Sequence, residues 1–287
     1  MKAIVCVKQV PDTQGKVAVK ADGTMDRSAM ATITNPDDLN AVEAALQLKD
    51  ETGCEVIVVT MGPPPAEGML RELMARGADR GVLVSGREFG GSDTFATSQI
   101  LAAAVNKIGV GPEDIVFCGR QAIDGDTAQV GPQIAEKLGI PQVTYAEEIV
   151  DLSNGHVTVK RRLENGVETV KAPLPCVITV NGSAPECRPR NAKRVMQYKY
   201  AVSTSEKAKL PEEKQALVDK RPGLNIDEWS AAYVEADPAQ IGMPGSPTKV
   251  KSIENVVFTA KECLTLGNDD AQLESLIKDL IANHTIG

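Results

Sequence analysis

The densest group of residues able to bind a ligand lies between residues 119 and 131, where a strand-like segment passes into a helix-like one. The run contains glycines, which permit close approach to the backbone, and amide, hydroxyl and carboxylate side chains that form hydrogen bonds. Backbone N–H groups in such a loop, and at the start of the following helix, can bind a diphosphate. A capped loop without a ligand has a similar composition, so both interpretations stay open on this run alone.

Two other segments follow a strand and offer polar groups to a ligand. Gly90-Gly91-Ser92-Asp93-Thr94 leads into a helix, with Thr97 one turn further on, and is typical of an anion-binding or flavin-edge loop. Lys8-Gln9-Val10-Pro11 follows the first strand, and its lysine is placed to meet a phosphate. The structural alternatives are an ordinary helix start and a solvated lysine at the end of a strand.

The motifs of several enzyme and nucleotide-binding classes are missing. No Gly-x-Gly-x-x-Gly follows the first strand, and the sequence has neither a phosphate-binding Gly-x-x-x-x-Gly-Lys-Ser/Thr motif nor a Gly-x-Ser-x-Gly nucleophile motif. The two histidines, His156 and His284, are interpreted as surface residues, and Asp124 and Asp126 as helix caps or ribose ligands. No self-contained set of catalytic residues is therefore predicted.

Composition and charge exclude further classes. The 287-residue chain is 42% hydrophobic but only 3% aromatic, which suits a parallel sheet covered by helices. Its net charge of −8 argues against a nucleic-acid partner. No apolar run approaches the roughly 18 residues of a membrane span, and the first residues lack the pattern of a signal peptide, so a cytoplasmic location is expected.

The cysteines are widely spaced and form neither a CxxC motif nor a cysteine–histidine cluster. Neither a metal site nor an iron–sulfur cluster is therefore expected, and the thiols are predicted to be buried or incidental. The six residues are Cys6, Cys54, Cys118, Cys176, Cys187 and Cys263.

The first 140 residues alternate between strand and helix signals. The helix that opens at Asn35-Pro36 has a favoured N-cap, a proline at its first position, two aspartates in its first turn and a stop at Gly53. Four strand–helix repeats predict a doubly wound α/β domain with a mostly parallel sheet. The expected strands cover 3–7, 56–61, 82–84 and 115–118, and the expected helices 35–52, 66–76, 94–108 and 128–138.

The pattern changes in the second half of the chain. Residues 143–181 alternate at period two, and turn signals at Asn154-Gly155 and Asn165-Gly166 predict an added β-hairpin region. A last apolar strand is expected at 176–180.

Regularity falls after about residue 182. The exception is an amphipathic helix signal near the C-terminus, formed by Leu273, Leu276, Ile277, Leu280 and Ile281. We therefore expect an α/β domain that binds a nucleotide or flavin over 1–182. Over 183–287 we expect an arm or small subdomain that requires a partner surface.

Four motifs form a recognisable set: Cys6-Val7-Lys8-Gln9-Val10-Pro11-Asp12-Thr13, Asn35-Pro36, Gly77-Ala78-Asp79 and Gly119-Arg120-Gln121-Ala122-Ile123-Asp124-Gly125-Asp126-Thr127. In order and spacing they resemble those of electron-transfer flavoprotein beta subunits. The resemblance covers roughly residues 1–200 and is specific, because separated motifs agree. Phe89–Thr94 and Asp124–Gly131 are most similar to the anaerobic, electron-bifurcating branch of that family.

The resemblance implies a cofactor and a reaction. Beta subunits of the ordinary branch hold a structural AMP, whereas those of the bifurcating branch hold FAD in the same place. That FAD takes a hydride from NADH and passes one electron to ferredoxin or flavodoxin. The other electron crosses to a second FAD, on the alpha subunit of the heterodimer, and reaches a partner dehydrogenase or reductase. The flavin supplies the redox chemistry, and the protein positions and tunes it.

The resemblance also assigns residues to the cofactor site. The run from Gln121 to Gly131 is expected to hold the diphosphate and ribose, and Asn35 and Met61 to border the adenine. Gly91–Thr94 and Thr97 are expected near the flavin or the incoming nicotinamide nucleotide. The expected cofactor-binding residues are Val7, Lys8, Gln9, Asn35, Met61, Gly62, Gly91, Asp93, Thr94, Thr97, Gln121, Asp124, Gly125, Asp126, Thr127, Ala128, Gln129, Val130 and Gly131.

A basic stretch at 188–199 is expected to dock the redox partner. Family members carry a Leu-Arg-x-Pro-Arg-Tyr-like segment before a loop that docks on an acyl-CoA dehydrogenase. The corresponding run here is altered, with Ala192 where a docking leucine is expected. An enoyl-CoA reductase or a flavin-dependent lactate dehydrogenase is therefore an alternative acceptor, and a solvated basic face is the structural alternative. The residues expected to dock are Arg188, Arg190, Ala192, Lys193 and Arg194.

Two functions compete with a bifurcating redox module. One is the ordinary electron carrier with AMP in the beta subunit. The other, of a different class, is an adenine-nucleotide-binding regulatory or ATP-hydrolysing protein on a similar α/β scaffold. The missing phosphate-binding motif disfavours this last function, and an ATP-turnover assay separates it from both redox functions.

Overall fold

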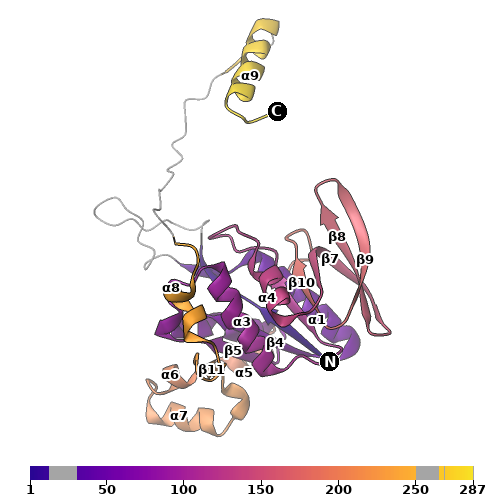
Figure 1. Ribbon diagram of the computed structural model, residues 1–287. Helices are drawn as coiled ribbons and strands as arrows, with labels where there is room; N and C mark the ends of the chain where they lie inside the picture. The colour runs from indigo at the N-terminus through magenta and orange to yellow at the C-terminus, as the bar shows by residue number, and fades with distance from the viewer. Residues whose placement is uncertain (13–30, 250–264, 268, 287) are drawn as a thin grey trace, which may run out of the picture. The chain divides into compact units, whose positions relative to one another are not determined.

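The computed structural model describes residues 1–12, 31–249, 265–267 and 269–286 (Figure 1). The chain divides into two compact units, residues 1–251 and 252–287, and each is described by itself. Thr13 of the first motif and Cys263 lie outside the described residues.

Among the described residues, a nine-stranded sheet forms the centre of the larger unit, in the order β11-β5-β4-β1-β6-β10-β7-β8-β9. Neighbours from β11 to β7 are parallel, and β8 pairs antiparallel with both β7 and β9. A separate antiparallel pair joins β2 (Gln9–Pro11) and β3 (Thr32–Thr34). The strands of the large sheet are β1 (Lys2–Cys6), β4 (Glu55–Met61), β5 (Arg80–Val84), β6 (Ile115–Gly119), β7 (Gln142–Ser153), β8 (His156–Leu163), β9 (Gly166–Pro173), β10 (Cys176–Val180) and β11 (Asp227–Trp229).

Helices cover both faces of the parallel part of the sheet. The central strands are buried on both sides, which explains why they are continuous apolar runs. On one face, Leu46 and Leu70 of α1 (Pro36–Thr52) and α2 (Glu67–Arg76) join the core that contains Val5. On the other face, Ile100 and Ile134 of α3 (Thr94–Ile108) and α4 (Val130–Leu138) join the core that contains Ile4. The predicted doubly wound α/β fold is confirmed.

The ends of α1 follow from its sequence. Pro36 occupies the first turn together with two aspartates, and Gly53 adopts the left-handed conformation (φ 74°) that ends the helix. Asn35 stands at the N-cap position, but its side chain makes no capping hydrogen bond to the helix. The side chain is therefore available for contacts outside the helix.

The hairpin region extends the central sheet. The start of β7 pairs with β10, and its remainder pairs with β8, so a single 12-residue strand connects the parallel and antiparallel parts. Asn154 and Gly155 both have positive φ (53° and 71°), as the first predicted turn requires. At the second turn, Gly166 has φ 149° and begins β9.

Residues 183–249 belong to the larger unit, whereas the sequence predicts a boundary at residue 182. The segment contributes β11, which pairs with β5, and buried side chains such as Val202 and Trp229. Its elements are too short to show a clear hydrophobic period, which is why the sequence looks irregular there. The helices of this segment are α5 (Ala192–Tyr198), α6 (Thr204–Lys207), α7 (Glu212–Asp219) and α8 (Gly242–Gly245), and it also contains 3₁₀ turns at Pro222–Leu224 and Pro238–Gln240. Two further 3₁₀ turns lie earlier in the chain, at Pro64–Ala66 and Arg87–Phe89.

The smaller unit contains the amphipathic helix expected near the C-terminus, α9 (Asp270–Ala282). The Asp269 side chain caps it by accepting a hydrogen bond from Gln272 N (3.0 Å). Leu273, Leu276, Ile277 and Ile281 are exposed, with Ile277 at 51% and Ile281 at 52%, whereas Leu280 is half-buried. Across the described residues, we find no helix that is both long and apolar enough to cross a membrane.

Candidate functional site

A cavity of about 450 Å³ lies at the carboxyl ends of β1, β4 and β6, where α/β sheets bind their ligands. Five segments that are far apart in the sequence line it: the ends of β1 and β4, the start of α3, the loop from β6 to α4, and Asp38 in the first turn of α1. It contains most of the predicted cofactor-binding residues, namely Val7, Lys8, Met61, Asp93, Thr94, Thr97, Gln121, Asp124, Gly125, Asp126, Thr127, Ala128, Gln129, Val130 and Gly131.

The loop between β6 and α4 forms the longest wall of this cavity. Asp126 and Ala128 have positive φ (50° and 52°), which is uncommon for residues other than glycine. Gln121 Nε2 donates to Asp126 Oδ1 (2.8 Å), a bond within the loop that accompanies this conformation. Thr94 Oγ1, at the start of α3, donates to Gln129 Oε1 (2.9 Å) and connects the two sides of the cavity. Backbone strain of this kind concentrates at ligand-binding loops.

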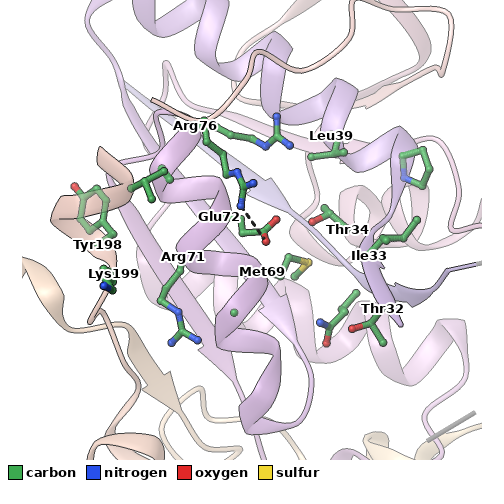
Figure 2. A pocket seen from close by; sticks show the side chains of 16 residues that line it. Thr32, Ile33, Thr34, Leu39, Met69, Arg71, Glu72, Arg76, Tyr198 and Lys199 are labelled. Carbon is green, nitrogen blue, oxygen red and sulfur yellow. Dashed lines mark hydrogen bonds and ion pairs between the residues drawn. The ribbon is translucent and has the colours of Figure 1, made fainter. Parts of the chain in front are cut away.

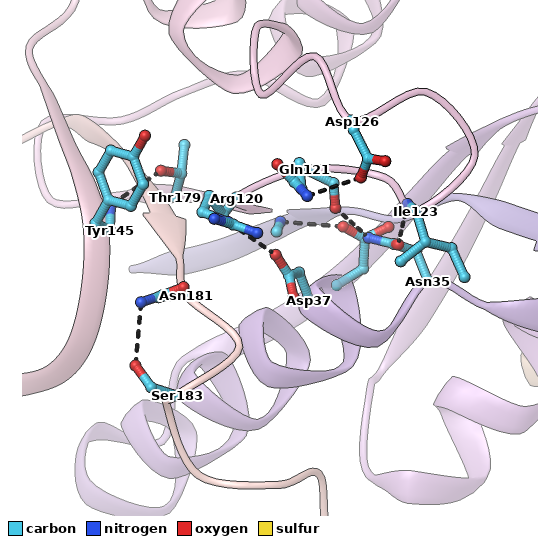
Figure 3. A network of polar contacts seen from close by, with 12 residues as sticks. Asn35, Asp37, Arg120, Gln121, Ile123, Asp126, Tyr145, Thr179, Asn181 and Ser183 are labelled. Carbon is cyan, nitrogen blue, oxygen red and sulfur yellow. Dashed lines mark hydrogen bonds and ion pairs between the residues drawn. The ribbon is translucent and has the colours of Figure 1, made fainter. Parts of the chain in front are cut away.

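The side chain of Asn35 forms hydrogen bonds with the backbone of this loop, as Figure 3 shows. Its Nδ2 donates to the carbonyl oxygen of Gln121 (2.7 Å), and its Oδ1 accepts from the backbone N–H of Ile123 (3.1 Å). The residue is fully buried and does not line the cavity. We expected Asn35 to border the adenine, but its side chain is used to fix the backbone of the loop.

Asp38, one helical turn after Asn35, connects the ends of β1 and β6. Its Oδ2 accepts from Lys8 N (2.7 Å) and its Oδ1 from Gly119 N (3.1 Å). The side chain lines the cavity, yet the residue is only 7% exposed. Burial raises the pKa of Asp38 to about 7, although the hydrogen bonds that it accepts act in the opposite direction.

Lys8 and Arg120, the cations that line the cavity, each have an acidic partner. Lys8 Nζ contacts both carboxylate oxygens of Asp124 (2.7 and 2.8 Å), which ties the end of β1 to the loop after β6. Arg120 Nε lies 3.4 Å from Asp37 Oδ2 at the start of α1 (Figure 3). The first turn of α1 therefore contacts the loop through Asn35, Asp37 and Asp38.

Asp93 is occupied by contacts within the protein. Its Oδ1 accepts from Ala96 N (3.0 Å) and caps α3, while its Oδ2 accepts from Thr248 N (2.9 Å) and Thr248 Oγ1 (2.7 Å). Partial burial alone would raise the pKa of Asp93, but these hydrogen bonds outweigh it and lower the pKa. Asp93 is thus held as a carboxylate at one side of the cavity.

The remaining predicted cofactor residues lie outside this cavity. Gln9 and Gly62 line an adjoining space of about 840 Å³, which shares Lys8 and Met61 with the first. Gly91 lies against the side chain of Met243, at a positive φ of 74°. Sequence reasoning missed four residues that line the cavity: Cys6, Asp38, Leu101 and Cys118.

Cys6 and Cys118 are paired positions on β1 and β6, at the base of the cavity. The neighbouring Cys6 thiol and burial raise the pKa of Cys118, so it remains a protonated thiol. Cys54 and Cys176 are also buried, and Cys187 is half-buried. Among the described residues, no group of three or more His, Cys, Asp and Glu side chains is placed to hold a metal ion.

The five residues predicted to dock a partner separate into two groups. Arg188 pairs with Glu43 (2.9 Å) and Asp50 (2.8 Å), and Arg194 Nε donates to the carbonyl oxygen of Met74 (2.8 Å). The hydrogen bond with Glu43 raises the pKa of Arg188. Arg188 connects the segment before α5 to α1, and Arg194 connects α5 to α2. Arg190, Ala192 and Lys193 are exposed.

Removing Arg188 is expected to cost stability, because Glu43 is 6% exposed and would lose its cation. Arg188→Ala should lower the free energy of unfolding by about 2 kcal/mol, since an unpaired buried carboxylate is costly. Arg190→Ala removes an exposed contact with Glu72 (3.5 Å) and should change it by less than about 1 kcal/mol. Denaturant unfolding measures both values, and equal losses would contradict a structural role of Arg188.

Comparisons with known proteins agree with the motifs. A family model described as electron transfer flavoprotein domain matches residues 22–208. The acryloyl-CoA reductase electron transfer subunit gamma of Anaerotignum propionicum is 50% identical over 287 residues, which is 100% of both chains. Caffeyl-CoA reductase-Etf complex subunit CarD of Acetobacterium woodii is 53% identical over 180 residues, 62% of this chain and 68% of the relative. The electron transfer flavoprotein subunit beta of Clostridium acetobutylicum is 42% identical over 251 residues, 88% of this chain and 86% of the relative.

The fold and the extent of these matches place the chain in a class of α/β subunits of electron-transfer complexes. The chain belongs to the electron transfer flavoprotein family, in which it is a beta-type subunit. The resemblance seen in the sequence motifs is thereby confirmed.

Proposed function

We propose that this chain binds FAD in the cavity at the carboxyl ends of β1, β4 and β6, and that it is the bifurcating subunit of a heterodimer. In this role the FAD accepts a hydride from NADH and divides the two electrons between ferredoxin or flavodoxin and a second FAD on the alpha subunit. The observation that carries the proposal is the meeting of four distant, predicted cofactor segments around one cavity. The cytoplasm is the proposed location.

The space at this edge of the sheet supports FAD over AMP. The cavity of about 450 Å³ adjoins the space of about 840 Å³ through Lys8 and Met61. FAD contains a second nucleotide half that AMP lacks, so it requires more room than a single mononucleotide. The ordinary carrier with structural AMP remains the competing proposal, because the first cavity alone is suited to a mononucleotide.

The names of two relatives support an enoyl-CoA reductase as the electron acceptor. One is part of an acryloyl-CoA reductase and another of a caffeyl-CoA reductase complex, and both substrates are α,β-unsaturated thioesters. An acyl-CoA or flavin-dependent lactate dehydrogenase is the alternative. We propose that α9 docks on the alpha subunit through its exposed leucines and isoleucines.

The redox partner is proposed to dock on α5 and the groove beside it. This groove of about 730 Å³ lies between α2, α5 and β3, and Figure 2 shows Arg71, Arg76 and Lys199 around it. Val195 of α5 lines the groove and is 38% exposed, and Met196, which follows it in the sequence, is 69% exposed. Exposed apolar side chains with a basic rim suit a partner surface that is acidic around an apolar centre.

The number and kind of bound nucleotides test the proposal. The chain is co-expressed with its alpha subunit, purified and denatured, and the released FAD and AMP are quantified per heterodimer. We expect about two FAD and little AMP, because each subunit of a bifurcating heterodimer holds one flavin. NADH-driven reduction of ferredoxin by the same preparation then tests bifurcation. About one FAD and one AMP would instead identify an ordinary electron carrier.

A further inference from the structure

The cavity proposed to bind FAD is lined by more carboxylates than cations, although it must accept an anion. Its lining carries four carboxylates, Asp38, Asp93, Asp124 and Asp126, but only two cations, Lys8 and Arg120. The diphosphate of FAD adds two negative charges to this space. Backbone N–H groups at the start of α4 favour the anion, yet the carboxylates oppose it. One of these carboxylates must therefore be neutralised, or the binding affinity falls.

Three of the four carboxylates have a cationic partner, an exposed position or hydrogen bonds that outweigh their burial. Asp124 is paired with Lys8 (2.7 Å). Asp126 accepts a hydrogen bond from Gln121 Nε2 (2.8 Å) and is exposed to water. Asp93 accepts hydrogen bonds from Ala96 N and from Thr248, which hold it as a carboxylate. Each of these three carboxylates therefore already has a partner or an exposed position that compensates its charge.

Asp38 differs from them in its surroundings. It accepts hydrogen bonds from the backbone N–H groups of Lys8 and Gly119 and interacts with the Asn35 side chain, all of which are neutral groups. The ammonium of Lys8 is directed to Asp124, and Arg120 contacts Asp37. Asp37, its neighbour on α1, adds a like charge, and Cys118 below it is a neutral thiol. No cation is therefore paired with Asp38 among the described residues. Burial raises its pKa to about 7, within reach of a proton under physiological conditions.

We propose that Asp38 is a positioning residue that takes up a proton when an anionic nucleotide binds. The charged form repels the incoming diphosphate, and the neutral form does not. A proton from the buffer joins the carboxylate of Asp38, so the complex carries one negative charge fewer than its separated parts. The carbonyl oxygen of the resulting carboxyl group continues to accept a backbone N–H and thus keeps part of the link between β1 and β6. The inference rests on the proposed binding of FAD in this cavity.

The sign of the pH dependence follows from linkage. Because bound FAD favours protonated Asp38, affinity rises as pH falls through the pKa of the free protein. If the diphosphate raises that pKa by about one unit, FAD binds about tenfold more tightly near pH 6 than near pH 9. In that case about half a proton enters per FAD near pH 7.5, midway between the two pKa values.

Isothermal titration calorimetry of the full-length chain with FAD measures this proton directly. Titrations in two buffers with different ionisation enthalpies give the number of protons taken up, and a series from about pH 6 to pH 9 gives the affinity profile. FAD is the suitable probe because the terminal phosphate of AMP itself titrates near pH 6. We expect proton uptake in the wild-type chain, none in Asp38→Asn, and a flat affinity profile in that variant.

Asp126→Asn is the matched control. It removes a carboxylate from the same cavity, and asparagine tolerates the positive φ of that position. It should keep the proton uptake and the pH profile of the wild-type chain, whatever its affinity. Far-UV circular dichroism and thermal unfolding establish that Asp38→Asn folds. If it does not fold, absence of proton uptake in the wild-type chain, or loss of uptake in Asp126→Asn, still overturns the proposal.

The outcomes separate the two proposals. Failure of the wild-type chain to bind FAD overturns the proposed function. Binding of FAD without proton uptake, or with unchanged uptake in Asp38→Asn, overturns the role of Asp38 alone. Loss of proton uptake in Asp126→Asn would assign the proton to Asp126, and this result also overturns the proposed role of Asp38.

Discussion

Gly119→Ala is expected to abolish nucleotide binding and to lower the free energy of unfolding by about 3 kcal/mol. A Cβ atom at this position would overlap Asp38 Oδ1 and would lie 2.7 Å from both Asp37 C and Asp38 N. These atoms belong to the first turn of α1, which cannot move without displacing the helix, so overpacking is costly there. The same displacement breaks the hydrogen bond from Gly119 N to Asp38 (3.1 Å) and shifts the cavity loop.

Gly125→Ala is the control for this prediction. Gly125 belongs to the same loop and lines the same cavity, but an added Cβ would meet no atom within 4 Å. The variant should unfold within about 0.5 kcal/mol of the wild-type chain, because substitutions without a steric or polar conflict have small effects. Denaturant unfolding and FAD retention after purification are measured for both variants. Similar behaviour of the two would show that the contact with α1 does not restrict this loop.

Asn35→Ala should separate the loop between β6 and α4 from α1. The substitution removes both partners of the loop backbone, the acceptor of Ile123 N–H and the donor to the Gln121 carbonyl. Each of these part-buried backbone groups, if left without a partner, costs up to about 1–3 kcal/mol, so the free energy of unfolding should fall by about 2–6 kcal/mol. The loop that holds the diphosphate then loses its fixed geometry, and we expect at least tenfold weaker FAD binding, or roughly 1.4 kcal/mol.

Asn40→Ala provides a matched control on the same helix. Asn40 is similarly buried, at 8% exposure, and its Nδ2 donates to the carbonyl oxygens of Ala184 (2.8 Å) and Pro185 (2.9 Å), away from the cavity. It should lose a comparable amount of stability and keep its affinity for FAD. Unfolding curves and FAD titrations of both variants test this difference. Equal loss of FAD affinity in the two would mean that Asn35 acts through general stability only.

The sequence alone determined the elements of the central domain. Apolar runs and helical periods are local signals, and the helix expected at 94–108 begins and ends where α3 does. The turn at Asn154-Gly155 was predictable because few residue pairs accept two positive φ values. The motifs along residues 1–200 also identified the family, which the comparisons confirmed.

Two features depend on tertiary contacts: where the chain divides, and what the basic residues after residue 187 do. Three-residue strands such as β11 (Asp227–Trp229) gain stability only from the strand beside them, so residues 183–249 looked irregular but complete the sheet. Arg188 and Arg194 appeared as part of an exposed basic stretch, but their partners come from α1 and α2. Pairing across more than 100 residues leaves no local pattern in a sequence.

In the site too, some residues could be recognised from local sequence and others only from tertiary contacts. Its loops were recognisable because glycines and polar residues follow strands, whereas Asn35 and Asp38 carry helix-start signals that say nothing about a loop 80 residues away. Only folding brings the first turn of α1 against the ends of β1 and β6 and buries Asp38 there. Burial and hydrogen bonding determine the proton affinity of a carboxyl group, and both are properties of the packed structure.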